Sequence, residues 1–354
     1  EDSETPWLTS RTIDFIEEQG DQPWCAHVSY IKPHWPYIVP APYHDMYGHN
    51  QIQPVNRTEA ERKDAQPVFG QYMNNGIGRL YHRDEVRAKV IPAYMGLIKQ
   101  CDDQMGRLFA YLEETGRMDD TLIVITSDHG DYLGDHWMGE KSLFHDCSVK
   151  VPLIIYDPSE VADATRGTVC EELVESIDLV ATFIETAGGE VPDHIVEGRS
   201  LLPFLHGGEP ENWREFAISE FDYSATPMAA NLGLSPRDAR LFMVADKRWK
   251  FWHAEGGLRP MLFDMENDPD ELTDLATMPG HEEIIELMYD RLGQWARRFS
   301  QRTAISDPQI LAARGKSTRK GVLINLYDGS EVAPELTMRY RDRKIPQNHL
   351  KPKP

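Results

Sequence analysis

Apolar side chains change their spacing along the first half of the chain. A recurrence every three to four residues predicts helices, over residues 9–19, 89–115 and 176–187. Continuous apolar or β-branched runs predict buried strands, over residues 24–30, 121–126 and 151–156. This order of helices and strands predicts an α/β domain, with a mostly parallel sheet sandwiched between helices.

The pattern changes after Pro203, where short apolar runs are separated by polar turns. These runs predict strands, over residues 216–221, 241–245, 249–253 and 261–263. The amphipathic segment 282–299 then predicts one helix, so we expect a small antiparallel sheet with a helix packed on it. The predicted domains are a large α/β domain, a smaller α+β domain and an extended C-terminal tail, over residues 1–207, 208–300 and 301–354.

Proline and glycine refine the predictions around the second helix. Residues 31–83 are rich in Pro, Asn, Tyr and charge, so we expect a long irregular excursion, which in a compact domain is usually functional. Pro92 is expected in the first turn of the helix that follows, where its missing N–H costs little. Gly116 is expected to end that helix.

Charge and hydropathy exclude two classes of partner. The formal net charge of −21 disfavours nucleic acid, because phosphate backbones require clustered Lys and Arg. A small anionic substrate remains possible, since one metal ion and a few local cations can reverse the field in a cleft. No apolar run approaches 18 residues, so no membrane span is predicted. The basic stretch 314–353 indicates a solvated tail or a subunit contact in a homo-oligomer, rather than an anion-binding arm.

The four cysteines indicate a reducing compartment. They have no CxxC spacing, which argues against a zinc–cysteine site. The opening residues, Glu1–Glu4, have neither the basic nor the apolar stretch of a signal peptide. We therefore expect reduced thiols in a cytoplasmic protein.

An Asp-His-Gly sequence follows the β-branched run 121–126 directly. Ligands bind at the carboxyl ends of strands in open α/β sheets. Asp128 and His129 could therefore place a carboxylate oxygen and an imidazole nitrogen on one metal ion, while Gly130 lets the backbone turn away. The alternative is a capped turn with a surface histidine.

Two further residues are candidates for chemistry. Lys141 could bring a positive charge and three donors back to this site, although a lone lysine is more often a surface residue. His34 is stiffened by Pro33 and Pro36 at the predicted exit of the run 24–30, so it could protonate a leaving oxygen. Its alternative is a packing role. The pair Asp135–His136 is interpreted as a hydrogen-bonded brace within its loop.

Several motifs together resemble the sulfatase branch of the alkaline phosphatase superfamily. They are Lys-Pro-His-Trp-Pro-Tyr, Ser-Asp-His-Gly-Asp-Tyr-Leu-Gly-Asp-His followed by Lys141, Gly-Arg-Ser-Leu-Leu-Pro, and Leu-Phe-Asp-Met-Glu-Asn-Asp-Pro-Asp-Glu-Leu. The resemblance covers roughly residues 5–300. Ala-Pro-Tyr-His-Asp-Met-Tyr at 41–47 and Ser-Glu-Phe-Asp-Tyr at 219–223 are most similar to the phosphonate monoester hydrolase and phosphodiesterase group.

The resemblance implies a mechanism and a set of cofactors. One divalent cation, Ca²⁺ or Mn²⁺, would be held by Asp128, His129 and N-terminal carboxylates. A formylglycine would attack phosphorus or sulfur in a small anionic ester. Lys141 would stabilise charge on the transferred group, and His34 would protonate the leaving oxygen.

The chain departs from this family at the nucleophile. The family's Cys-x-Pro/Ala-x-Arg signature fits none of the four cysteines. We therefore expect an N-terminal segment outside this sequence to carry the formylglycine, and the 354 residues alone to be inactive and loosely packed.

Three alternatives stay open. One is an arylsulfatase-type sulfate ester hydrolase. Another is a two-metal phosphodiesterase of the same superfamily, for which His253 or His281 would be the further ligand. The third is a non-catalytic relative, against which the joint presence of the four candidate site residues argues.

Overall fold

The computed structural model describes residues 3–192, 196–297, 311, 312 and 314. Two compact units divide the chain. The described part of unit 1 is residues 3–53 and 83–109, and the other described residues belong to unit 2. The predicted boundary at residue 207 stays a prediction. The predicted tail lies outside the described residues apart from Leu311, Ala312 and Arg314.

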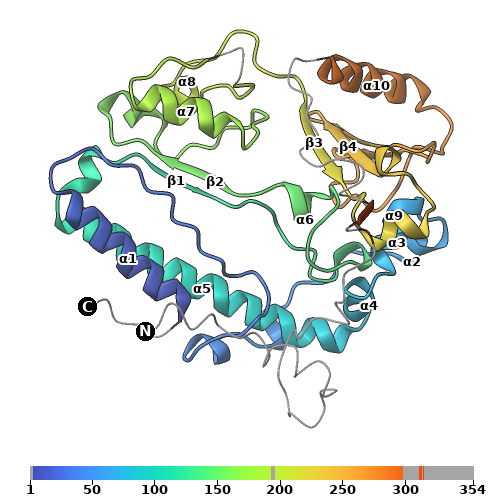
Figure 1. Cartoon of the computed structure of the whole chain (residues 1–354), viewed down its shortest axis with the longest axis horizontal. Helices are drawn as coiled ribbons and strands as arrows, with labels where there is room; N and C mark the ends of the chain where they lie inside the picture. Colours follow the sequence, from blue (N-terminus) through green and yellow to red (C-terminus); the bar gives the residue numbers. More distant parts are fainter. Residues whose placement is uncertain (1–2, 193–195, 298–310, 313, 315–354) are drawn as a thin grey trace. The chain divides into compact units, whose positions relative to one another are not determined.

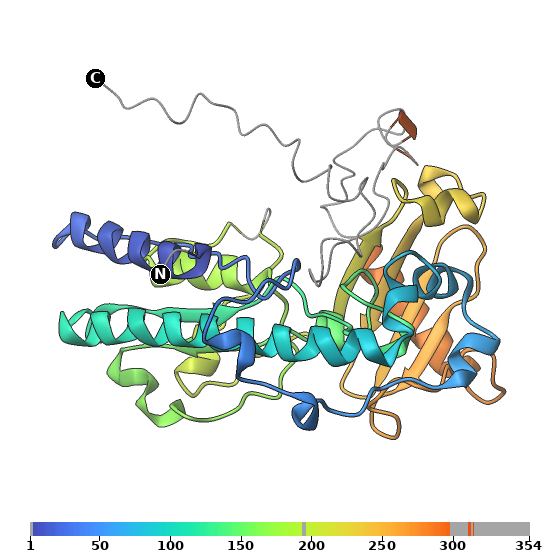
Figure 2. The same ribbon diagram turned by 90° about the horizontal axis from the view of Figure 1, so that it is seen from below.

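Two helices run side by side (Figures 1 and 2): α1 (Glu4–Gln19) and α5 (Asp84–Glu114), which belongs to unit 1 as far as Phe109. Gln100 Nε2 donates a hydrogen bond to Ser3 Oγ at 2.8 Å. Both helices confirm the sequence prediction but begin five residues earlier, α5 with acidic residues that suit a helix N-terminus. Pro92 therefore lies inside α5, and its predicted place in the first turn is wrong.

The predicted strand 24–30 is wrong, because within the described part of the chain these residues form no ladder of backbone hydrogen bonds with a neighbouring strand. A strand needs a partner to satisfy its backbone, and an apolar run does not specify one. The excursion that follows is irregular to Thr58 except for two short helices, η1 (Tyr43–Asp45) and η2 (His49–Gln51). It then forms α2 (Glu59–Lys63), α3 (Pro67–Met73) and α4 (Gly78–Tyr81).

The first sheet of unit 2 has two strands, β1 (Ile123–Thr126) and β2 (Leu153–Tyr156). They pair antiparallel, with Ile123 opposite Tyr156, so the predicted parallel pairing is wrong for these two strands. A parallel pair needs a crossover, usually a helix. Between β1 and β2 the chain forms only η4 (Asp135–Trp137) and α6 (Asp146–Val149), too short to cross a sheet.

The second sheet has the strand order β3-β4-β5-β6, and every neighbouring pair is antiparallel. Its strands are β3 (Ala217–Asp222), β4 (Arg240–Ala245), β5 (Trp249–Ala254) and β6 (Met261–Asp264). Helix α10 (Glu282–Ala296) lies along this sheet in Figure 1. The predicted small antiparallel sheet with one helix is confirmed.

Successive side chains of β4 point to opposite faces of this sheet. Phe242 and Val244 pack with Met288 of α10. Leu241 and Met243 belong to the core on the other face, which includes residues of α3 and of the loop 132–144. The period of two places alternate side chains on opposite faces. The sheet is thereby packed against the loop that follows β1.

The remaining elements are short. These are η3 (Arg117–Asp120), η5 (Glu160–Thr165), α7 (Asp178–Thr186), α8 (Leu202–Leu205), α9 (Pro227–Asn231) and η6 (Pro236–Asp238). One of them, α7, confirms the helix predicted over residues 176–187. Gly116 ends α5 as predicted, in the left-handed region with φ 71°. Among the described residues, no helix is both long enough and apolar enough to cross a membrane.

Candidate active site

The loop that leaves β1 is fixed by a close backbone approach at Gly130. Its N–H donates to the carbonyl oxygen of Ser148 at 2.8 Å. A Cβ at this position would lie 2.0 Å from the carbonyl oxygen of Cys147, so no other residue fits without a backbone shift. The glycine therefore allows the backbone after β1 to contact α6 closely, and this contact fixes the backbone next to Asp128 and His129.

The hydrogen bonds of His129 define its tautomer. Nδ1 lies 2.7 Å from the carbonyl oxygen of Gly130, which only accepts, so Nδ1 carries the proton. Nε2 lies 2.9 Å from Lys141 Nζ, and an ammonium only donates. Nε2 therefore presents its lone pair, as a metal-binding imidazole must. Asp128 Oδ2 lies 3.7 Å from the same nitrogen.

The donor pair combines an exposed carboxylate with a half-buried imidazole and suits a divalent cation. The Asp128 side chain is 88% exposed, and that of His129 is 26% exposed. A carboxylate oxygen and an imidazole nitrogen are donors found together on divalent metals. Within the described residues, no group of three or more His, Cys, Asp or Glu side chains gathers at one point. This part of the chain thus offers two donors, which fit an incomplete coordination shell.

Lys141 returns to His129 through a tongue, which we define as residues 131–140. Tyr132 N–H donates to the carbonyl oxygen of Glu140, and Gly134 N–H donates to that of Met138, both at 2.8 Å. These two bonds pair the outgoing and returning arms, with the tip at residues 135–137 and the base beside His129. The structure thereby brings Asp128, His129 and Lys141 together, while their chemical roles stay predictions.

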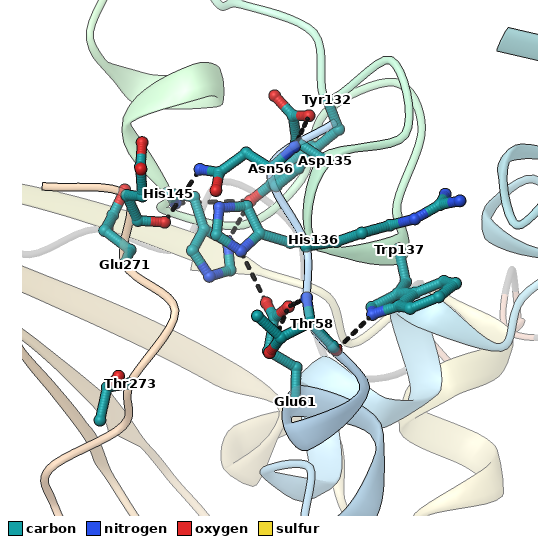
Figure 3. Close-up of polar contacts among 12 residues, drawn as sticks. Asn56, Thr58, Glu61, Tyr132, Asp135, His136, Trp137, His145, Glu271 and Thr273 are labelled. Carbon is teal, nitrogen blue, oxygen red and sulfur yellow. Dashed lines mark hydrogen bonds and ion pairs between the residues drawn. The ribbon is translucent and has the colours of Figure 1, made fainter. Parts of the chain in front are cut away.

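His136 and Trp137 at the tip of the tongue are buried, and Asp135 is half-buried (Figure 3). Asp135 Oδ1 accepts a hydrogen bond from the backbone N–H of Asn56 at 2.9 Å. His136 Nδ1 lies 2.7 Å from Glu61 Oε1, and these two side chains are only 2% and 5% exposed. The interpretation of Asp135 and His136 as a pair hydrogen-bonded within their loop is wrong in its partners, because each bonds to the segment 56–61, and these bonds fix the loop from outside.

His34 belongs to unit 1. Its Nδ1 donates to the carbonyl oxygen of Trp35 at 2.7 Å. Lys32 Nζ donates to the carbonyl oxygens of His34 and Pro36, at 3.3 and 3.2 Å. These bonds hold the backbone on both sides of the imidazole. The general-acid role of His34 stays a prediction.

A buried polar network behind the tongue was not predicted. The His145 ring stacks on that of His136, with centroids 3.7 Å apart, and its Nδ1 bonds to Tyr132 Oη at 2.9 Å. Burial lowers the pKa of His145 well below its ordinary value, and electrostatic interactions with His136 and Lys250 lower it further. Lys250 Nζ pairs with Glu271 at 2.7 Å and with Asp146. No motif marks His145 or Lys250.

The histidines of the two-metal alternative bond elsewhere. His253 Nδ1 lies 3.3 Å from Tyr289 Oη, and its Nε2 lies 3.7 Å from Glu255. His281 Nδ1 lies 3.3 Å from the carbonyl oxygen of Met278. Neither forms a metal-binding group with Asp128 and His129 within the residues that the structure covers.

Two of the thiols are unsuited to nucleophilic attack. Burial raises the pKa of Cys101 to about 11, and it also raises the pKa of Cys147 strongly. A thiol acts as a nucleophile only when it is deprotonated, so both are inert at neutral pH. Cys25 and Cys170 are exposed, and all four cysteines are free of disulfides.

Known proteins resemble the chain over most of its length. Residues 5–189 match the sulfatase family, and residues 134–298 match the C-terminal region of N-sulphoglucosamine sulphohydrolase. The multifunctional alkaline phosphatase superfamily protein PehA of Trinickia caryophylli is 34% identical over 88% of this chain and 63% of its own length. An arylsulfatase of Clostridium perfringens is 29% identical over 80% of this chain and 56% of its own length.

Solved structures agree with these relatives. The phosphonate monoester hydrolase of Silicibacter pomeroyi has a TM-score of 0.76 at 33% identity, covering 84% of this chain and 61% of that one. That of Agrobacterium radiobacter has a TM-score of 0.73 at 32% identity, with the same coverage. The chain thus spans under two thirds of these relatives. They confirm the predicted alkaline phosphatase-like α/β fold with a smaller antiparallel domain, and the chain belongs to the sulfatase family.

Proposed function

We propose that the full-length protein hydrolyses phosphonate monoesters and phosphodiesters. The observation that carries the proposal is the cluster of Asp128, His129 and Lys141 at the end of β1. It occurs in a chain about one third identical to two phosphonate monoester hydrolases. An open carboxylate and an imidazole lone pair could hold a divalent cation, and that cation together with the Lys141 ammonium would suit a tetrahedral anion better than a neutral substrate.

Four residues of this chain would have separate roles in the reaction. Asp128 and His129 Nε2 would hold a divalent cation, Ca²⁺ or Mn²⁺, which when bound supplies positive charge to the transferred group. Lys141 now donates to His129 Nε2, and it would turn its donors to the anionic oxygens of the ester. His34 would give a proton from Nε2 to the leaving oxygen, which requires prior protonation of that nitrogen.

We assign the nucleophile to a formylglycine outside these 354 residues. The thiols of Cys101 and Cys147 are protonated at neutral pH, and no cysteine has the family's signature. The partner of this chain is then its own N-terminal segment, and the 354 residues alone should not turn over substrate. A homo-oligomer and a cytoplasmic location belong to the same proposal, and the four free cysteines suit a reducing compartment.

Sulfate ester hydrolysis is the second candidate. The arylsulfatase of Clostridium perfringens favours it, and the same donors can bind a tetrahedral sulfate. The test compares the full-length protein and the 354-residue chain on an aryl phosphonate monoester, an aryl phosphodiester and an aryl sulfate, before and after chelation. Faster turnover of the sulfate would replace the first proposal with the second. Metal-dependent turnover by the 354 residues alone would contradict the assignment of the nucleophile.

The role of His34 has its own test. In a series of aryl leaving groups, His34→Ala should reduce kcat roughly 10²- to 10⁴-fold for poor leaving groups and little for good ones. A good leaving group departs without a proton, so it does not need the acid. An equal loss across the series would assign His34 to packing instead.

A further inference from the structure

The segment 56–61, part of the excursion before α3, holds the tip of the tongue (Figure 3). The backbone of Asn56 bonds twice, because its N–H donates to Asp135 Oδ1 at 2.9 Å and its carbonyl accepts from the N–H of His136 at 2.8 Å. Trp137 Nε1 donates to the carbonyl oxygen of Thr58 at 2.7 Å. Each residue of the tip therefore has a bond to this segment.

Glu61 uses its two carboxylate oxygens for two different tasks. Oε1 bonds to His136 Nδ1 at 2.7 Å, and Oε2 accepts from the backbone N–H of Thr58 at 2.6 Å. The second bond belongs to a capping box, Thr58-Glu59-Ala60-Glu61, at the start of α2. One buried carboxylate thus joins the first turn of α2 to the tip of the tongue. Charged hydrogen bonds of this kind are about twice as strong as neutral ones.

The tongue connects the contacts of its tip to the backbone at Lys141. Its two arms are joined by the backbone bonds from Tyr132 to Glu140 and from Gly134 to Met138. Lys141 follows the returning arm directly, and its long side chain reaches His129 Nε2 at 2.9 Å. Its ammonium can keep this position only if the backbone at residue 140 is fixed, and the contacts of the tip fix it.

We propose that Glu61 is a positioning residue, which acts through His136 and the tongue to keep Lys141 beside His129. It touches neither a donor of the candidate metal site nor Lys141. Its effect on turnover rests on the proposed function, whereas its effect on the tongue does not. The test therefore needs one readout of the tongue itself and one of catalysis.

Four variants of the full-length protein separate positioning from stability. Glu61→Ala removes both bonds, and Glu61→Gln keeps one acceptor. Glu59→Ala is the matched control on α2, because the Glu59 side chain is 67% exposed and its ion pair is with Arg62, whose own contact with the ring of Trp137, 4.6 Å from the centroid, does not involve Glu59. Glu175→Ala is the stability control, because Glu175 pairs with Arg214 and accepts from Ile218 N–H, far from the tongue in sequence.

Hydrogen exchange at the amides of Tyr132 and Gly134 reports on the tongue. Glu61→Ala should raise both exchange rates roughly tenfold to a hundredfold, and Glu61→Gln should raise them less. Glu59→Ala should change neither rate. Glu175→Ala should lower the Tm without selective exchange in the tongue. Unchanged tongue exchange in Glu61→Ala, or the same rise in Glu175→Ala, would overturn the proposal.

Kinetics on an aryl phosphonate monoester give the second readout. Glu61→Ala should lower kcat roughly tenfold to a hundredfold with a smaller change in KM, because a displaced charge is missed most in the transition state. Partial recovery in Glu61→Gln supports positioning. A loss of kcat in Glu175→Ala as large as that in Glu61→Ala would overturn it. If the wild-type protein hydrolyses no ester, the proposed function fails and the exchange experiment decides the inference about the tongue.

Discussion

Two Asp-His pairs lie seven residues apart in the loop after β1, and the fold treats them oppositely. At the base of the tongue Asp128 is exposed and His129 is half-buried, with a carboxylate oxygen open to solvent and the Nε2 lone pair turned to Lys141. Asp135 and His136 face protein at its tip, and both are bonded to residues 56–61. Identical side chains thus become a candidate ligand pair at one end and a brace at the other, according to burial and partners.

The largest expected effect comes from removing the carboxylate of each pair in turn. In the full-length protein, Asp128→Ala should lower kcat more than about a thousandfold and weaken metal binding, because a ligand is lost. Its Tm should change little, since that side chain is exposed. Asp135→Ala should instead keep the metal and lower the free energy of unfolding by about 1–3 kcal/mol.

Metal titration and thermal melting of both variants check the comparison. If Asp128→Ala retained wild-type metal affinity, the base of the tongue would not be a metal site. If Asp135→Ala lost the metal with no change in Tm, the two pairs would have exchanged roles.

Replacement of Lys141 should have the next largest effect. Lys141→Met should lower kcat roughly 10²- to 10³-fold, as expected for one preorganised donor. Metal affinity should stay equal or rise, because His129 Nε2 loses a competing hydrogen bond. Lys141→Arg should recover little, since a planar guanidinium does not replace a point charge. A matched fall in metal affinity, measured by titration, would assign Lys141 to structure rather than catalysis.

The smallest expected effect is a pH dependence of the free energy of unfolding, caused by His145 behind the tongue. The pKa of His145 is lowered in the folded protein, so below about pH 6.5 the unfolded chain binds one more proton than the folded one. Stability should therefore fall as the pH decreases from about 6.5 to 5, by up to about 1.4 kcal/mol per unit from this residue. Above about pH 6.5 His145 is neutral in both states and does not change the free energy of unfolding with pH.

Urea unfolding at several pH values measures this slope. His145→Phe should be less stable but should lose the contribution of this residue to the slope. His44 is exposed, so His44→Gln is the control, and this variant should keep the wild-type dependence of stability on pH. An unaltered slope in His145→Phe would mean that another group binds the extra proton.

The sequence predicted the positions of helices and strands better than it predicted which strands pair and in which direction. Period and length are local, so α1, α5, α10 and the strands of the second sheet lie within a few residues of their predicted bounds. The pairing of β1 with β2 is not local. The signal against a parallel pair was available, because residues 127–150 contain no helical pattern long enough for a crossover.

The candidate site shows the same limit. The motifs predicted Asp128, His129 and Lys141, and the structure brings these three together. Glu61 was missed, although Thr58-x-x-Glu61 is the sequence signature of a capping box. His145 and Lys250 had no such signature, because their importance depends on tertiary contacts. His145 packs against Trp252 of β5 and Phe263 of β6, and Lys250, itself in β5, pairs with Asp146 and Glu271.

The backbone of the tongue has a consequence for the order of folding. Several non-glycine residues in and beside it adopt positive φ, namely Leu133, His136, Trp137, Glu140 and Ser142. Each such residue costs about 1–2 kcal/mol, so the tongue is unstable until its tertiary contacts form. We expect the tongue to be unstructured in the folding transition state, with φ-values near zero for substitutions at Leu133, measured from folding and unfolding rates. A φ-value near one would instead place the tongue in the folding nucleus. With φ-values near zero, catalytic competence would be the last property that the folding chain acquires, and unfolding would remove it first.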